Sequence, residues 1–229
     1  MKIGFTGLNL PEGKIKYNDK VLTALATKDK AKKISPFFVE FLKEEYLDSD
    51  AIVLHQDYLL DVLILDIEKI ENRCNRTSNQ EELDLLKKCL IHLDKEQPLC
   101  DMVFNNIESE ILKVLSPYSM KTIIQMPEES DINNIIKIVL EKTANMFFYT
   151  SGPSESHAWL VPKGSDIITC ASKIHSDLAR GFIKGDVVSY DDYINCHNFN
   201  ECKSKGVAKM VDKEYIVQPN EIIEIRFNV

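Results

Sequence analysis

The clearest pattern in the chain is a pair of apolar stripes at helical spacing between residues 58 and 95. Residues 58–76 place aliphatic side chains on one broad face, which predicts an amphipathic helix. They are Leu59, Val62, Leu63, Leu65, Ile67 and Ile70. After a polar break, Ser78 and Glu81 have the spacing of a capping box, so a second helix is expected over 79–95. Two such helices joined by a short turn predict an antiparallel helical hairpin.

The remainder of the first 145 residues alternates between short apolar runs and helical patterns. Three segments predict short strands, at 2–7, 50–55 and 121–126, and the apolar run at 50–55, which polar residues bound, is expected to be buried. Three further segments predict helices, at 18–27, 35–47 and 131–144. The helix expected over 35–47 has Pro36 in its first turn. We therefore expect a reduced α/β region over residues 1–145, from which the hairpin at about 58–95 protrudes.

From Met146 the pattern changes to that of strands. The expected strands are 146–150, 157–161, 182–189, 209–211, 214–217 and 222–227. One helix, at about 167–175, lies among them. Two strands, a helix and then further strands are the order of a β-grasp, so the fold class is α+β with a β-grasp domain over 146–229.

Turn residues support this interpretation of the last third. Gly152 with Pro153, and Lys163 with Gly164, supply turn chemistry between strands. Gly181 restarts a strand and is expected to have a positive φ. Asn220 occupies the third place of the last turn and suits a left-handed conformation there.

Composition and charge limit the partners. The 229 residues are 44% apolar and 28% charged, which is ordinary globular composition. The net charge is −8, with 19 Lys and Arg against 25 Asp and Glu in the first 150 residues and 9 against 11 in the last 79. Neither part is basic, so binding to RNA requires a local patch, and DNA is not expected as a partner.

The compartment is expected to be the cytoplasm. No apolar run approaches the roughly 18 residues of a membrane-spanning helix, and the start of the chain has no signal-peptide pattern. The six cysteines are scattered and include no C-x-x-C, which favours free thiols in a reducing compartment. Cys196, His197 and Cys202 match no common zinc spacing, so no metal site is assigned.

A damaged phosphate-loop pattern follows the first strand. Five residues separate Gly7 from Gly13, where a working loop has four, and Lys14 follows Gly13. Ile15 stands where a Ser or Thr would hold Mg²⁺. Elsewhere, His175 and Asp177 are interpreted as a structural pair at a helix end. No catalytic residue is assigned.

The last third resembles the C-terminal, TGS-type domain of the YchF family of Obg-related P-loop NTPases. The resemblance rests on ordered matches at 148–153, 158–164, 174–182, 188–193, 215–218 and 226–229. The motif residues are Gly152, Pro153, Trp159, Lys163, His175, Asp177, Arg180 and Gly181.

The first 145 residues resemble a truncated, degenerate version of the family's G domain. Residues 3–14 are similar to its first strand and phosphate loop, and 38–53 to a helix and strand. Residues 61–73 and 83–93 are similar to its helical arm. Near residue 125 the family has an N-x-x-E that reads the base; here Gln125 replaces the Asn and Glu128 remains. The candidate nucleotide-binding residues are therefore Gly7, Gly13, Lys14 and Glu128.

Two functions follow from the resemblance. The first is a non-catalytic binding or regulatory protein whose TGS domain contacts a ligand, RNA, the ribosome or a protein partner, without a resident cofactor. The alternative is weak binding of ATP or GTP, with or without Mg²⁺, or residual NTPase activity. A scaffold that dimerises through the helical arm is a third possibility.

Overall fold

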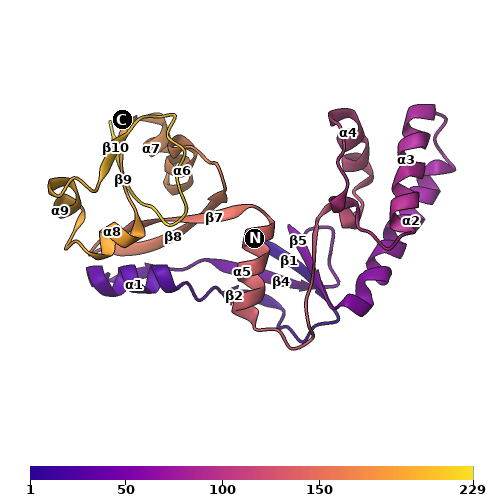
Figure 1. Ribbon diagram of the computed structural model, residues 1–229, viewed down its shortest axis with the longest axis horizontal. Helices are drawn as coiled ribbons and strands as arrows, with labels where there is room; N and C mark the ends of the chain where they lie inside the picture. The colour runs from indigo at the N-terminus through magenta and orange to yellow at the C-terminus, as the bar shows by residue number, and fades with distance from the viewer. Residues whose placement is uncertain (229) are drawn as a thin grey trace. The chain divides into compact units, whose positions relative to one another are not determined.

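The computed structural model describes residues 1–228 and divides into two compact units (Figure 1). The N-terminal unit comprises Met1–Ile15 and Val39–Val139. The C-terminal unit comprises Lys16–Phe38 and the chain from Leu140 onward. The expected single boundary at residue 146 differs from these units mainly because residues 16–38 pack with the last third of the chain.

The N-terminal unit contains a five-stranded sheet of order β2-β4-β1-β5-β6. Its strands are β1 (Lys2–Thr6), β2 (Gly13–Lys16), β4 (Phe38–Lys43), β5 (Ala51–Leu54) and β6 (Thr122–Gln125). Strand β1 pairs in parallel with β4 and β5, and β5 pairs in parallel with β6. All four residues of β5 are buried, as expected for a central strand of a parallel sheet.

The helix expected over 35–47 is wrong. This segment instead forms β3 (Lys33–Ser35) and β4. In β4, Val39 and Phe41 are fully buried while their neighbours are more exposed, which is the two-residue period of a strand. Pairing of β4 with β1 supplies the backbone hydrogen bonds that a helix would otherwise make.

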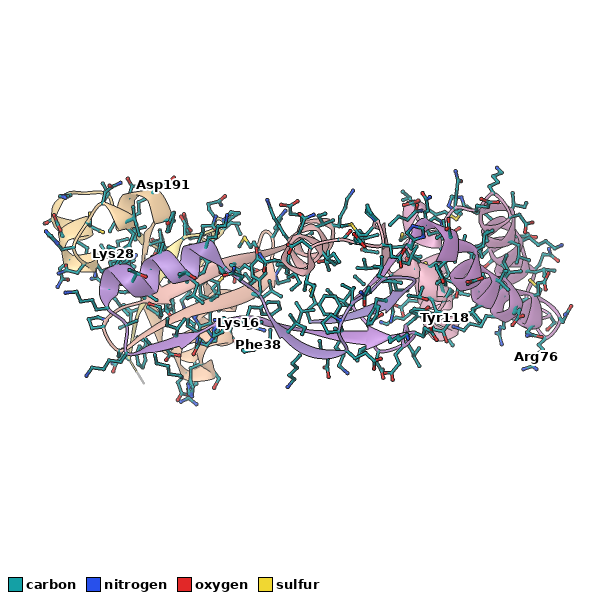
Figure 2. The ribbon with its side chains drawn as sticks, turned by 90° about the horizontal axis from the view of Figure 1, so that it is seen from below. Lys16, Lys28, Phe38, Arg76, Tyr118 and Asp191 are labelled. Carbon is teal, nitrogen blue, oxygen red and sulfur yellow. The ribbon has the colours of Figure 1, made fainter. Side chains whose placement is uncertain are left out.

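Helices α2 (Leu59–Cys74) and α3 (Gln80–Leu93) pack against each other around a shared core. Leu63, Ile70 and Leu86 are fully buried there. Asn79, not Ser78, caps α3 by accepting hydrogen bonds from the backbone N–H groups of Glu81 and Glu82. The expected Ser78–Glu81 capping box is therefore wrong. Figure 2 labels Arg76 at the turn between α2 and α3.

Several short elements complete the N-terminal unit. Helix α4 (Asn106–Leu115) begins with a full capping box between Asn105 and Glu108 and lies alongside α3 (Figure 1). Single 3-10 turns are η1 (Gln56–Tyr58), η2 (Leu99–Asp101) and η3 (Tyr118–Met120). Helix α5 (Ile132–Lys142) runs from this unit into the next.

The C-terminal unit contains a mixed six-stranded sheet of order β10-β9-β11-β7-β8-β3. The strands not yet given are β7 (Asn145–Ser151), β8 (Glu155–Pro162), β9 (Phe182–Val188), β10 (Lys209–Val211) and β11 (Ile222–Phe227). The helices are α1 (Lys20–Asp29), α6 (Ile167–Ile174), α7 (Ser176–Arg180), α8 (Tyr190–Ile194) and α9 (Phe199–Ser204). Residues 214–217, expected as a strand, contribute only an isolated bridge between Ile216 and Asp166.

Helices cover both faces of this sheet. Phe148 packs with Ile167 and Cys170 of α6 in one core cluster of this unit. Its neighbour Tyr149 points to the opposite face, where it reaches the N-cap of α1. Figure 2 shows α1, which carries Lys28, lying along the strands of this unit.

A positive φ is expected at two turn positions, Asn220 and Gly181. Asn220 has φ 63°, so the left-handed turn position is confirmed. Gly181 has φ −93° and ends α7 by donating its N–H to the carbonyl of Asp177, so the expected positive φ is wrong.

Candidate functional site

The first candidate site is the carboxyl edge of the parallel sheet in the N-terminal unit, the usual ligand edge of such sheets. Gly7 directly follows β1 and has φ 65°. A Cβ atom at Gly7 would lie 2.2 Å from the ring of Tyr58, so only glycine fits between this turn and the ring. The aromatic ring of Tyr58 therefore lies directly against the turn that follows β1.

The segment from Gly7 to Lys14 does not lead into a helix. Gly13 and Lys14 belong to the edge strand β2, and β4 lies between β2 and β1 in the sheet. A phosphate loop relies on backbone N–H groups that point from a loop and from the first turn of the following helix. The structure thus separates Lys14 from the turn at Gly7 by a strand.

A shallow pocket of ≈ 250 Å³ lies farther along the same edge, at the ends of β5 and β6. It is lined by His55, Gln56, Gln125, Met126 and Pro127. His55 accepts a hydrogen bond from the backbone N–H of Asp57, which fixes the start of η1. Glu128 follows Pro127 and is exposed. The pocket is smaller than the roughly 300–1,000 Å³ typical of small-molecule sites.

The second candidate region contains the motif residues of the C-terminal unit. Trp159 stacks with His157, at 3.6 Å between ring centroids, and with Phe148, at 6.3 Å. The indole N–H of Trp159 donates to the hydroxyl of Thr150 at 3.0 Å. The ring of Trp159 thus packs against side chains of its own unit. Desolvation lowers the pKa of His157, which outweighs the opposing effect of Glu155.

The motif residues of α7 make local contacts. His175 caps α7 through Nδ1, which accepts from the backbone N–H of Asp177 at 3.2 Å. Asp177 also forms a 2.9 Å ion pair with Arg180. His175 and Asp177 therefore lie together at the start of α7.

The remaining motif residues lie in turns. Gly152 and Pro153 form the turn between β7 and β8, and the carbonyl of Pro153 accepts from the N–H of Lys32. Lys163 follows β8 and donates its backbone N–H to Ala144. Beside these turns, an open groove of ≈ 610 Å³ runs between β8 and α6, with Leu160, Ile168 and Ser172 in its lining.

Carboxylates at both ends of α1 attach this helix to the C-terminal unit, a feature that the sequence analysis missed. Asp19, buried at the N-cap, accepts a 2.7 Å hydrogen bond from the Tyr149 hydroxyl. At the other end, Asp29 accepts from Ser151 at 2.6 Å and from Tyr193 at 2.9 Å. Desolvation, and then the adjacent carboxylates, raise the pKa of both tyrosines, so these hydroxyls remain protonated donors. No local sequence signal links residues so far apart.

A second polar cluster joins the last strands. Asp186 on β9 accepts two hydrogen bonds from Arg226, at 2.7 and 2.9 Å, and pairs with Lys203 at 3.0 Å. Desolvation opposes ionisation of Asp186, but the hydrogen bonds from Arg226 and Lys203 outweigh it and lower the pKa of the carboxyl. Arg226 and Lys203 therefore form ion pairs within the fold.

The two units differ in charge. The residues of the N-terminal unit carry 12 Lys and Arg against 22 Asp and Glu, a net −10. Those of the C-terminal unit carry 16 against 14, a net +2. The difference arises because residues 16–38 contribute six lysines and only two aspartates. Of these lysines, Lys30 and Lys32 are exposed near the end of α1.

No site for a metal is formed by His, Cys, Asp or Glu side chains within residues 1–228. Cys202 lies beside Cys196, and desolvation raises its pKa to about 12, which keeps it a protonated thiol. Across the same residues, every helix is too short or too polar to cross a bilayer.

Comparison with known proteins shows which proteins this chain is similar to. The YchF-GTPase_C family model, described as a protein of unknown function, matches residues 146–228. A protein of Mycoplasma genitalium called ribosome-binding ATPase YchF is 29% identical over 158 residues, which cover 68% of this chain and 43% of that protein. The chain is related to the YchF family. The YchF protein of Buchnera aphidicola (strain APS), also called a ribosome-binding ATPase, is 26% identical over 245 residues, covering 83% of this chain and 67% of that one.

A solved structure supports the same relationship at the level of the fold. The Schizosaccharomyces pombe YchF GTPase superposes with a TM-score of 0.78 and 16% identity, over 99% of this chain and 97% of that one. By contrast, this chain spans less than half the length of the Mycoplasma YchF protein. The two proteins therefore share the mixed α/β fold with its two sheets.

Proposed function

We propose that this YchF relative is a non-catalytic binding protein that contacts the ribosome or its RNA through the C-terminal unit. We further propose that this unit is a β-grasp domain of the TGS type, and that the N-terminal unit is a reduced G domain with α2 and α3 as its helical arm. The observation that carries the proposal is the contact between Gly7 and Tyr58, together with the strand that replaces a helix after the loop.

Catalysis of phosphoryl transfer depends on preorganised donors around the phosphates and on a bound Mg²⁺. The ring of Tyr58 lies against the turn where the phosphates would bind, and Lys14 is on a separate strand. Ile15 offers no oxygen to Mg²⁺. Loss of a single electrostatic contact of this kind typically reduces the rate by about 10²–10³, so we expect no hydrolysis above background.

The charge of the C-terminal unit supports a ribosomal contact. Its net +2 contrasts with the −10 of the other unit, and the exposed Lys30 and Lys32 supply a local positive patch for phosphates. Relatives named as ribosome-binding cover both units. The Trp159 and His175 motif residues make contacts inside the fold, so we assign the contact to the lysine segment.

Cosedimentation with ribosomes tests the proposal. We expect the chain to pellet with ribosomes at about 50 mM salt and to dissociate towards about 200 mM. The double variant Lys30→Gln/Lys32→Gln should reduce the slope of log K against log salt by about one per lysine. Lys95→Gln, an exposed lysine of the N-terminal unit, is the matched control. Equal binding by all three proteins would exclude the lysine segment, and no pelleting at low salt would exclude the ribosome.

The alternative is weak binding of ATP or GTP at the pocket beside His55 and Gln125, at the carboxyl edge of the sheet. Phosphate release with Mg²⁺, and the thermal shift with each nucleotide, distinguish the two functions. The proposed function predicts neither turnover nor a shift. A shift without turnover would favour a nucleotide-binding protein, while turnover that is lost in Lys14→Ala would show an active NTPase.

A further inference from the structure

We infer that the groove between α3 and α4 is a docking site for a basic, amphipathic peptide segment of another protein. The groove, of ≈ 320 Å³, has Leu85, Ile107 and Ile111 among its lining residues. It lies within the N-terminal unit, so the inference is independent of the proposed ribosomal contact.

Apolar side chains are unusually exposed beside this groove. Val103, Ile107 and Val114 are 91%, 70% and 89% exposed. Within α4, Ile107, Ile111 and Val114 follow a spacing of four and three residues, which is one stripe along the helix, and Val103 lies just before the helix begins. Surface aliphatic residues are ordinarily scattered, whereas a contiguous stripe that borders a groove is typical of a binding surface.

The rim of the groove is acidic. Glu81 and Asp84 line it on α3, and Glu108 lines it on α4. Lys88 pairs with Glu108 at 3.3 Å. Within residues 1–228, Glu81 and Asp84 have no ion-pair partner; Asp84 accepts only the side-chain amide of Gln80. An apolar floor with two unpaired carboxylates complements a helix that carries aliphatic residues on one face and lysines or arginines beside them.

Charge disfavours the other occupants. A second copy that docked through its own N-terminal unit would bring together two units of net charge −10, which repel each other. RNA would place phosphates beside Glu81 and Asp84, where like charges repel. A cationic peptide removes both difficulties because its lysines neutralise these carboxylates while its leucines cover Ile107 and Ile111.

The full chain can be tested by fluorescence anisotropy with a short labelled peptide of leucine and lysine in amphipathic spacing. The control peptide has glutamate in place of lysine. We expect the lysine peptide to bind and the glutamate peptide not to bind. Binding of the lysine peptide should weaken about tenfold in Ile107→Gln, and similarly in Glu81→Gln/Asp84→Asn. The matched control is Ile64→Gln, which makes the same substitution at an exposed isoleucine of α2, away from the groove. This variant should bind the lysine peptide as wild type does.

Backbone amide NMR of the wild-type chain gives a readout that needs no variant. Shifts on addition of the lysine peptide should cluster at residues 81–88 and 103–114. The inference would be overturned if the lysine peptide bound wild type, Ile107→Gln and Glu81→Gln/Asp84→Asn with equal affinity. It would also be overturned if the amide shifts clustered elsewhere in the chain. An absence of binding, displacement of the peptide by oligouridine, or a concentration-dependent dimer that Ile107→Gln dissociates would overturn it as well.

Discussion

The hydroxyl of Tyr149 donates a 2.7 Å hydrogen bond to the carboxylate of Asp19, which lies 130 positions earlier in the chain. Asp19 also caps α1 by accepting from the N–H groups of Val21 and Leu22. One buried carboxylate thus starts a helix and joins it to strand β7. Together with Asp29 at the other end, it makes residues 16–38 part of the C-terminal unit.

Tyr149→Phe should reduce the free energy of unfolding by about 1–3 kcal/mol, because it leaves a buried carboxylate oxygen without its donor. Chemical denaturation of the full chain measures this change. Tyr190→Phe is the matched control, since the hydroxyl of Tyr190 has no hydrogen-bond partner within residues 1–228. If both variants unfold like wild type, the bond to Asp19 contributes nothing to stability.

A fragment of residues 146–229 should be poorly ordered on its own, because it lacks α1 and β3. Their removal exposes Phe147 and Tyr149, which are 8% and 1% exposed in the whole chain. We expect poorly dispersed amide NMR signals from this fragment, and dispersion restored by a synthetic peptide of residues 16–38. Well-dispersed signals from the fragment alone would show that the last third folds without this segment.

Leu86→Ala should destabilise the packing of α2 against α3 by about 2–5 kcal/mol, since this side chain is fully buried. Thermal melting followed by circular dichroism measures the loss. Leu65→Ala is the control, because Leu65 of α2 is 41% exposed and its truncation leaves no cavity. A Leu86→Ala protein that melts like Leu65→Ala would contradict a shared core between the helices.

The stabilisation from Asp186 should disappear in acid. Its folded-state pKa is lowered, so the ionised carboxylate stabilises the fold above the unfolded pKa of about 3.9 and this contribution is lost as pH falls through the lower folded value. We expect Asp186→Asn to reduce the free energy of unfolding by about 1–3 kcal/mol near neutral pH. In acid, the difference in stability between this variant and wild type should be smaller.

Thermal melts of wild type and Asp186→Asn between about pH 2 and pH 7 measure how the stability difference between the two proteins depends on pH. Asp191→Asn, at an exposed position of α8 labelled in Figure 2, should follow the wild type throughout. If the stability difference between wild type and Asp186→Asn were constant over the whole pH range, it would contradict the lowered pKa of Asp186.

Elements with a strong local signal were predictable from the sequence. The apolar stripe of α2 identified that helix, and the turn chemistry at Asn220 identified its left-handed conformation. Residues 35–47 were not predictable in this way, because β4 is stabilised by pairing with β1 rather than by its own pattern. Its identity as a strand depends on a partner at the other end of a long connection.

The candidate sites show the same division. Gly7 was identified from its position after a strand, but the ring that lies against it belongs to Tyr58, 51 residues later. Asp19 and Asp29 have the appearance of ordinary helix-end residues, and their partners follow more than 120 positions later. Sequence periodicity carries no information on contacts of this kind.

The interleaved order of the two units has a consequence for synthesis of the chain. Ser35 and its partner Glu155 are 120 residues apart, so β3 emerges long before the strand that covers it. At about 5–20 residues per second, the wait is roughly 6–24 s. During that interval the edge of β3 and the carboxylates of α1 have no native partner, so this segment is open to wrong strand pairing until β8 has emerged.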